Sequence, residues 1–355
     1  MSDPGAEDVE KLLKKLEARL TKEYSEATKE MRKKVDDYFR RFQIKDAIKR
    51  QAVIDGKITQ ADYIAWRQGQ MMAGERWQAM LQTLAEDATM CNMKARSIVY
   101  GFEPDAYATN FNYGTFCVEA SSGVDTSFTL YSRETVERLV RDDPKLLPDP
   151  RPNGKLAQML AENKDMRWNM QKLNSAILQG VIQGESIPKI AKRVETVGQM
   201  NHKQAIRAAR TAMTGAQNAG RVDAAKRAEE MGIGTVLVWT ATIDMRTRYD
   251  HRQADGQRHR PGEAFDVGGY KLKFPGDPEA PAEQVCNCRC TLIPQNAKHQ
   301  YAVHTERTDL SQIEGMTYDE WRESHVEKPN RITLPEEKAA AIKGAYIKQY
   351  KDLKK

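Results

Sequence analysis

Residues 8–43 read DVEKLLKKLEARLTKEYSEATKEMRKKVDDYFRRFQ, and this stretch decides the fold class. Large apolar side chains recur in it at intervals of eleven residues. The two series are Val9, Leu20, Met31 and Phe42, and Leu13, Tyr24 and Val35. An eleven-residue repeat corresponds to about 3.67 residues per turn, which is close to a straight α-helix. The sequence therefore predicts one long helix over residues 8–43 whose apolar stripe lies along a partner or along the rest of the chain.

Residues 46–95 also show helical spacing. A break at Asp55–Gly56 is followed by Thr59, a residue type that favours the N-cap position. Methionine and tryptophan side chains then recur at helical spacing, which is more typical of a core than of a cofactor site. They are Trp66, Met71, Met72, Trp77 and Met80.

Residues 100–150 are rich in Gly, Asn, Ser and aromatic residues, and they predict a mixed region that ends in a helix capped by Ser132. A proline-dense connector follows, and a second helical region is expected over 156–183. Asn201 is predicted to cap a further helix that ends near Gly232. Small residues such as Gly215 inside that helix are expected to let another backbone approach closely.

The pattern changes after Gly232. TVLVWTA at 235–241 is β-branched and aromatic, Gly268–Gly269 predicts a turn, and CRCTLIP at 288–294 ends as a short strand. We therefore expect a mainly α protein with a small α+β domain, in which long N-terminal helices precede a compact helix-plus-β-hairpin unit. The predicted regions are an elongated helical part, a connector with helix, the α+β domain, and a polar tail with a basic terminal helix from Pro335. The elongated helical part spans 1–150 and the connector with helix spans 151–200. The α+β domain spans 201–295 and the polar tail spans 296–355.

The bulk composition restricts the protein class. The chain has 355 residues and a net charge of +6, which permits contact with nucleic acid or an acidic surface without requiring it. The sequence contains no run of 18 apolar residues, the length that a membrane-spanning helix needs. Its acidic first residues are unlike a secretory signal. We expect a chain made in a reducing cytoplasm, where its five cysteines form no disulfide framework. Cys91 and Cys117 are expected to be buried.

Three of the five cysteines fall in CNCRC, residues 286–290, and would share one face if that piece were extended. The preceding segment supplies Asp244, Asp250, His251 and His259. Two thiolates, an imidazole and a carboxylate form a ligand set that Zn²⁺ accepts. A cysteine nucleophile activated by His and Asp is a second interpretation. A disulfide within this short piece would be strained.

Five separated elements occur in an order that resembles the Mu F-like head-morphogenesis family, the minor capsid proteins of tailed bacteriophages. They are ARTA at 209–212, Trp239 with DMRTRYDH at 244–251, DGQ at 255–257, FPGD at 274–277 and NCRC at 287–290. The resemblance covers about residues 175–295. MTYDEW at 316–321 also resembles the ending of many minor head proteins.

The resemblance implies a structural Zn²⁺ bound by His251, Cys288 and Cys290, with Asp244 as the fourth ligand. Cys286 lies outside the usual NCRC element, and Ala212 stands where the family commonly has Glu. Several arginines offer a basic surface for nucleic acid or a partner protein, although a solvated basic face is the simpler interpretation. They are Arg207, Arg210, Arg246, Arg248 and Arg289.

The implied role is that of a minor capsid protein without enzymatic activity that acts in head morphogenesis. Its expected partners are the portal protein, major capsid or scaffold proteins, and packaged DNA, and its expected place is the head interior or portal vertex. It would assist head assembly, DNA packaging or ejection. Two alternatives stay open: a metal-dependent enzyme acting on nucleic acid, and a plain DNA-binding protein that uses its lysine-rich end.

Overall fold

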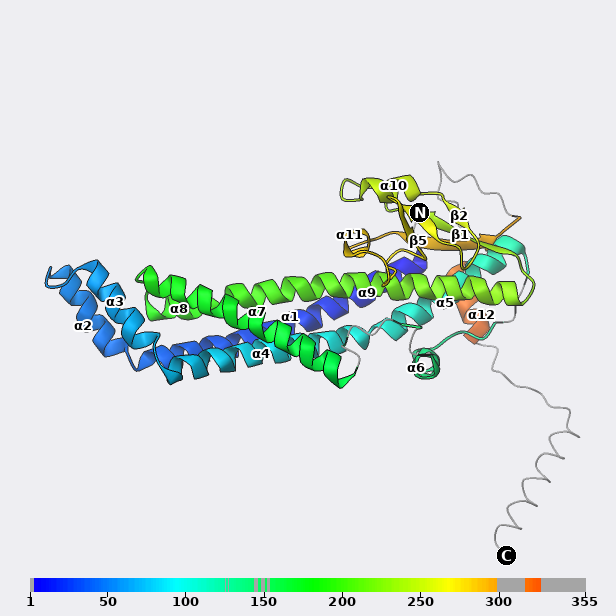
Figure 1. Ribbon diagram of the computed structural model, residues 1–355. Coiled ribbons are helices and arrows are strands. Elements are labelled where there is room, and N and C mark those ends of the chain that lie inside the picture. Colours follow the sequence, from blue (N-terminus) through cyan, green and yellow to red (C-terminus); the bar gives the residue numbers. More distant parts are fainter. Residues whose placement is uncertain are drawn as a thin grey trace, which may run out of the picture.

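Two helices of 37 residues, α1 (Pro4–Arg40) and α9 (Val194–Glu230), run along the molecule and pack against each other (Figure 1). α4 (Glu75–Tyr100) and α7 (Lys155–Ile182) complete an elongated bundle, and the small sheet lies at one of its ends. This computed structural model describes residues 3–124, 126, 128–143, 146–147, 151, 154–298 and 317–326.

The first long helix confirms the eleven-residue pattern. Asp3 caps α1 by accepting a hydrogen bond of 2.9 Å from the backbone N–H of Ala6. The predicted stripe is buried at Val9, Leu20 and Met31, against the other helices of the bundle. The apolar face of α1 is thus covered by the rest of the chain.

The bundle ends, at the side away from the sheet, in the helix pair α2 (Gln43–Ile54) and α3 (Gln60–Met71) (Figure 1). Thr59 caps α3 as predicted, and Asp62 completes a reciprocal capping box with it. The methionine and tryptophan stripe is core: Met71, Trp77 and Met80 are buried.

α5 (Glu103–Ser122) is one helix where the sequence predicted a mixed region, so that prediction was wrong. Sixteen of its twenty residues are buried, and a helix buried on all sides carries no apolar-to-polar period. It packs against α9 so closely that a Cβ on Gly220 would lie 2.5 Å from the carbonyl oxygen of Tyr107. The small and amide residues that resembled a loop permit this close packing.

α6 (Arg133–Asp142) begins at the predicted cap, where Ser132 Oγ accepts from the backbone N–H of Thr135 at 3.3 Å. After α7, the short helix α8 (Ile187–Lys192) leads directly into α9. Asn201 is therefore not the N-cap: it is buried inside α9, where its amide donates to Asn169 Oδ1 of α7 at 2.9 Å. The four predicted regions stay a prediction, and the bound at 200/201 falls within α9.

The sheet orders its strands β2 (Arg258–His259), β1 (Thr235–Thr240) and β5 (Thr291–Asn296), all antiparallel. A separate hairpin joins β3 (Phe265–Val267) to β4 (Tyr270–Leu272) through the predicted Gly268–Gly269 turn. The short helices α10 (Tyr249–Ala254) and α11 (Ala282–Val285) complete the unit. The fold is mainly α with a small α+β part, as predicted.

The last described element, α12 (Tyr318–Val326), packs on α5. Trp321 lies against Phe116, and its Nε1 donates to Glu119 Oε2 at 2.6 Å. The basic helix expected from Pro335 lies outside the described residues. Among the described helices, none has the length and apolar character needed to cross a membrane.

Candidate metal centre

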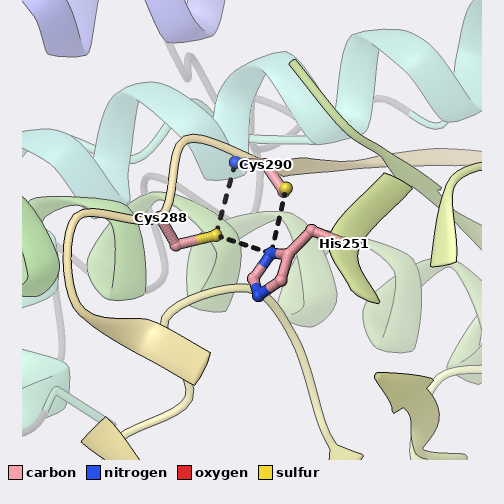
Figure 2. A group of neighbouring side chains, drawn as sticks. All are labelled: His251, Cys288 and Cys290. Atoms are coloured by element: carbon pink, nitrogen blue, oxygen red, sulfur yellow. Dashed lines mark hydrogen bonds between the residues drawn. The ribbon is translucent and has the colours of Figure 1, made fainter. Parts of the chain in front are cut away.

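His251, Cys288 and Cys290 converge in the α+β unit. Their ligand atoms all lie within 4.8 Å of one another, and the three residues are buried. His251 Nδ1 lies 3.4 Å from Cys290 Sγ and 3.5 Å from Cys288 Sγ (Figure 2). His251 comes from α10, and the cysteines come from the segment between α11 and β5. Two sulfur atoms and one imidazole nitrogen at this spacing fit a site that can hold Zn²⁺.

The third cysteine of the motif does not join the cluster. Asn287 has φ of +53°, a left-handed conformation, so the segment is not extended through Cys286 and Cys288. The backbone N–H of Cys290 then approaches Cys288 Sγ at 3.4 Å. The condition for all three cysteines to share one face, an extended piece, is therefore not met, and Cys286 lies outside the cluster.

Helix α9 holds the cysteine segment in place. Thr214 Oγ1 lies 2.9 Å from the carbonyl oxygen of Cys288, and the amide of Asn218 donates to the carbonyl oxygen of Cys290 at 3.3 Å. Gly215 meets the backbone of Gly276 so closely that a Cβ would lie 2.9 Å from its oxygen. The predicted close approach of a second backbone is thus present. Asn218 was not predicted from the sequence, where nothing distinguishes it from the neighbouring polar residue Gln217.

The second nitrogen of His251 is oriented by Gln284 of α11. Nε2 lies 3.1 Å from Gln284 Oε1, and Gln284 Nε2 donates to Asp250 Oδ2 at 3.3 Å. In the tautomer whose Nε2 donates to this amide oxygen, the lone pair of Nδ1 is available to bind a metal. Gln284 was also missed, because no spacing rule links it to His251.

The pKa values of the two buried thiols move in opposite directions. The hydrogen bond from Cys290, reinforced by His251, lowers the pKa of Cys288 well below its usual range. The same contact with Cys288, together with burial, raises the pKa of Cys290. Metal ligation by cysteine requires the thiolate, so one of the two ligands is close to its binding form.

Asp244 does not lie with these three ligands. Its carboxylate accepts two hydrogen bonds from Arg289, at 2.6 and 2.7 Å, and a third of 2.8 Å from the backbone N–H of Arg246. The hydrogen bonds from Arg289 lower the pKa of Asp244. Its role as fourth ligand stays a prediction. His259 lies elsewhere, with its ring edge against Phe265.

Four of the five predicted arginines line one groove of ≈ 760 Å³ beside the cluster, and Cys288 also lines it. The four are Arg210, Arg246, Arg248 and Arg289. Arg210 pairs with Glu17 at 2.7 Å, and Arg248 donates to the carbonyl oxygen of Cys286. Arg207 is exposed on α9 and is not part of this lining. A smaller cavity of ≈ 20 Å³ lies directly at the three ligands.

Residues 171–293 match the model of the family described as Phage Mu protein F like protein. The resemblance predicted from the sequence is confirmed, over nearly the predicted span. The match contains α9, β1, β2, the start of β5, and all three clustered ligands. No solved structure gives a significant match.

Three relatives are similar to the chain. Minor head protein GP7 of Bacillus phage SPP1 is 25% identical over 286 residues, which cover 80% of this chain and 83% of that protein. An NAD(+)–arginine ADP-ribosyltransferase of Enterococcus faecalis is 28% identical over 208 residues, 58% of this chain and 40% of that protein. An uncharacterised protein of Haemophilus influenzae is 27% identical over 152 residues, 43% of this chain and 31% of that protein.

Proposed function

We propose that this chain is a minor head protein of a tailed bacteriophage and acts in head morphogenesis. The observation that carries the proposal is the similarity to the SPP1 minor head protein, which extends over 83% of that protein's length. The similarity to the ADP-ribosyltransferase covers only 40% of its length, so that activity can reside in the part without a counterpart here. We therefore assign a structural role, with the portal, capsid or scaffold proteins as partners and the virion as its place.

We further propose a structural Zn²⁺ on His251, Cys288 and Cys290. The donor set fits the metal, and the site lies where a small unit needs stabilisation: the sheet has three strands, two of six residues and one of two. Bound there, Zn²⁺ would tie α10 to the segment before β5. Asp244 would become the fourth ligand only by leaving Arg289.

The groove lined by four arginines is the proposed contact for an acidic partner or for packaged DNA. Its guanidinium groups match carboxylate or phosphate oxygens in geometry as well as charge. Three of them already form ion pairs, Arg210 with Glu17 and both Arg246 and Arg289 with Asp244, so a ligand must compete for them.

Assembly in a host that expresses the head proteins tests the role. The chain carrying an epitope tag, produced together with the portal, scaffold and major capsid proteins of its own phage, is expected to sediment with the heads. A parallel expression without the portal protein tests whether the chain attaches to the portal. Loss of the chain from these heads would identify the portal as its attachment point. Heads that exclude the chain in both expressions would contradict the role.

Elemental analysis tests the metal. One zinc per chain is expected in the wild type, and less than a tenth of that in Cys288→Ser/Cys290→Ser. Cys286→Ser is the matched control, because this cysteine belongs to the same motif but not to the cluster, and it should keep its zinc. Equal zinc in all three proteins would disprove the site.

One observation favours a second candidate, a metal-dependent enzyme acting on nucleic acid. The cluster supplies three ligands, and a catalytic zinc keeps an open position. The adjoining cavity of ≈ 20 Å³ holds about one water molecule and no nucleotide, which favours the structural role. Nuclease assays with and without chelator separate the two: cleavage that is lost in folded His251→Ala would support the enzyme.

A further inference from the structure

α2, at the end of the bundle farthest from the sheet, turns its polar side inward. Its one buried residue is Asp46, whose carboxylate lies 3.2 Å from Arg67 Nε and accepts a hydrogen bond of 2.8 Å from the Tyr63 hydroxyl. Amphipathic helices of globular proteins normally bury their apolar face instead. The inward contact of α2 is therefore an ionic attachment to α3.

The outward side of α2 is apolar. Ile44, Ile48 and Ile54 are 77%, 63% and 73% exposed. At about 100° per residue, these three side chains fall with Ala47 and Gln51 into an arc of about 120°, opposite Asp46. Three exposed isoleucines on one side of a short helix form a candidate interaction site.

The segment between β5 and α12 is too short to reach this face. It has 18 residues, 299–316, and both of its ends are held at the sheet end, where Arg322 of α12 lies 3.9 Å from Asp8. A chain of 18 residues that goes out and returns can span at most about 30 Å. α1, which separates that end from α2, has 37 residues and is about 55 Å long.

The charge of the tip decides among the remaining occupants. The helix pair of the tip, residues 43–71, contains five Lys or Arg and three Asp, and residues 327–355 contain eight Lys or Arg and four Asp or Glu. Because both are also basic, neither the chain's own C-terminal part nor a second copy placed tip to tip is a favoured occupant of the outward face of α2. Phosphates of nucleic acid would match the lysines but leave the isoleucines uncovered.

We propose that the outward face of α2 docks a different protein, through a helix or groove that is apolar at its centre and acidic at its rim. Lys45 and Lys49 flank the isoleucines on one side and would pair with the rim. This inference rests on the tip alone and holds whether or not the chain proves to be a head protein.

The test uses the full chain and a fluorescein-labelled acidic peptide, an amphipathic helix with a leucine stripe flanked by glutamates. Fluorescence anisotropy is expected to show binding that weakens at least tenfold in Ile44→Ser/Ile48→Ser. Leu156→Ser/Leu160→Ser makes the same change on another exposed pair, at the start of α7, and should bind within twofold of wild type. Lys45→Glu/Lys49→Glu keeps the isoleucines and should also weaken binding, most of all at low salt.

Several results would overturn the proposal. Wild-type protein that fails to bind the peptide, or a double isoleucine variant that binds it equally well, excludes this face as the site. Vesicles of anionic phosphatidylglycerol that bind more tightly than the peptide, with the same dependence on Ile44 and Ile48, identify a membrane instead. A dimer in sedimentation that the isoleucine variant abolishes identifies a second copy. Circular dichroism of each variant confirms that it is folded.

Discussion

Each end of the elongated molecule contains one fully buried arginine, and the two are held very differently. At the sheet end, Arg221 of α9 pairs with both carboxylate oxygens of Asp3, at 2.6 and 2.7 Å, and donates to Asn110 and to the carbonyl oxygen of Leu292. At the tip, Arg67 lies beside Asp46 and donates to the carbonyl oxygen of Glu185 at 2.9 Å. Its Nη1 has no hydrogen-bond partner among the described residues.

This difference indicates that the sheet end stabilises the fold, whereas the tip is a small helix pair attached to the bundle. Arg221 joins the start of α1, the middle of α5 and strand β5, three segments that are far apart in the sequence. Arg67 holds only the small pair α2 and α3 against the turn before α8. Buried charges need complete hydrogen bonding to be stable, so the sheet end should resist perturbation more than the tip.

The largest effect is expected for Arg221→Met. The change removes the ion-pair partner of Asp3, which keeps its hydrogen bond from Ala6, and the donor to the Leu292 carbonyl. It should lower the free energy of unfolding by about 3 kcal/mol, the lower part of the range for a broken buried pair. Asp3 keeps some contact with water, which limits the loss. Denaturant titration measures it. Unchanged stability would show that the pairing at the sheet end is not what holds α1 to β5.

Metal removal should have the next largest effect and should act only at the sheet end. At a hundredfold excess of Zn²⁺ over its Kd, binding stabilises the folded chain by about 2.7 kcal/mol, which a chelator removes. Thermal denaturation with and without chelator measures the shift. Cys286→Ser should retain the shift and Cys288→Ser/Cys290→Ser should lose it; equal responses of the two variants would contradict the assignment.

Arg67→Met should cost less, about 1–2 kcal/mol, because Asp46 keeps its hydrogen bond from Tyr63 and lies 3.6 Å from Arg50. Hydrogen exchange followed by mass spectrometry locates the effect. We expect faster exchange in α2 and α3 and no change in β1 and β5. A loss as large as that of Arg221→Met would remove the distinction between the two ends.

Ile44→Ser/Ile48→Ser should have the smallest effect on stability, within about 0.5 kcal/mol, since both side chains are already in water. The same titration measures it, with Leu156→Ser/Leu160→Ser as the matched exposed pair. A loss above 2 kcal/mol would mean that the isoleucines support the fold, and the tip would no longer be a surface kept for binding.

The sequence predicted well where one local physical rule applied. The stripe of Val9, Leu20 and Met31, the cap at Thr59 and the Gly268–Gly269 turn each depend on neighbouring residues along one element. Prediction failed at α5, where burial on all sides removes the periodic signal, and at Asn201, because an amide suited to capping also pairs with another helix. The fold class followed from the first kind of signal.

At the candidate site the division is similar. The residue types and their order predicted a zinc site on His251, Cys288 and Cys290, because few kinds of side chain bind zinc. Only the tertiary structure supplied Gln284 behind His251, the pairing of Asp244 with Arg289, and the exclusion of Cys286 by the turn at Asn287. The chain's own sequence thus determined which elements form and which donors exist. Their partners were decided by the packing of α9 against the sheet, because contacts between residues far apart in the chain depend on how whole elements meet.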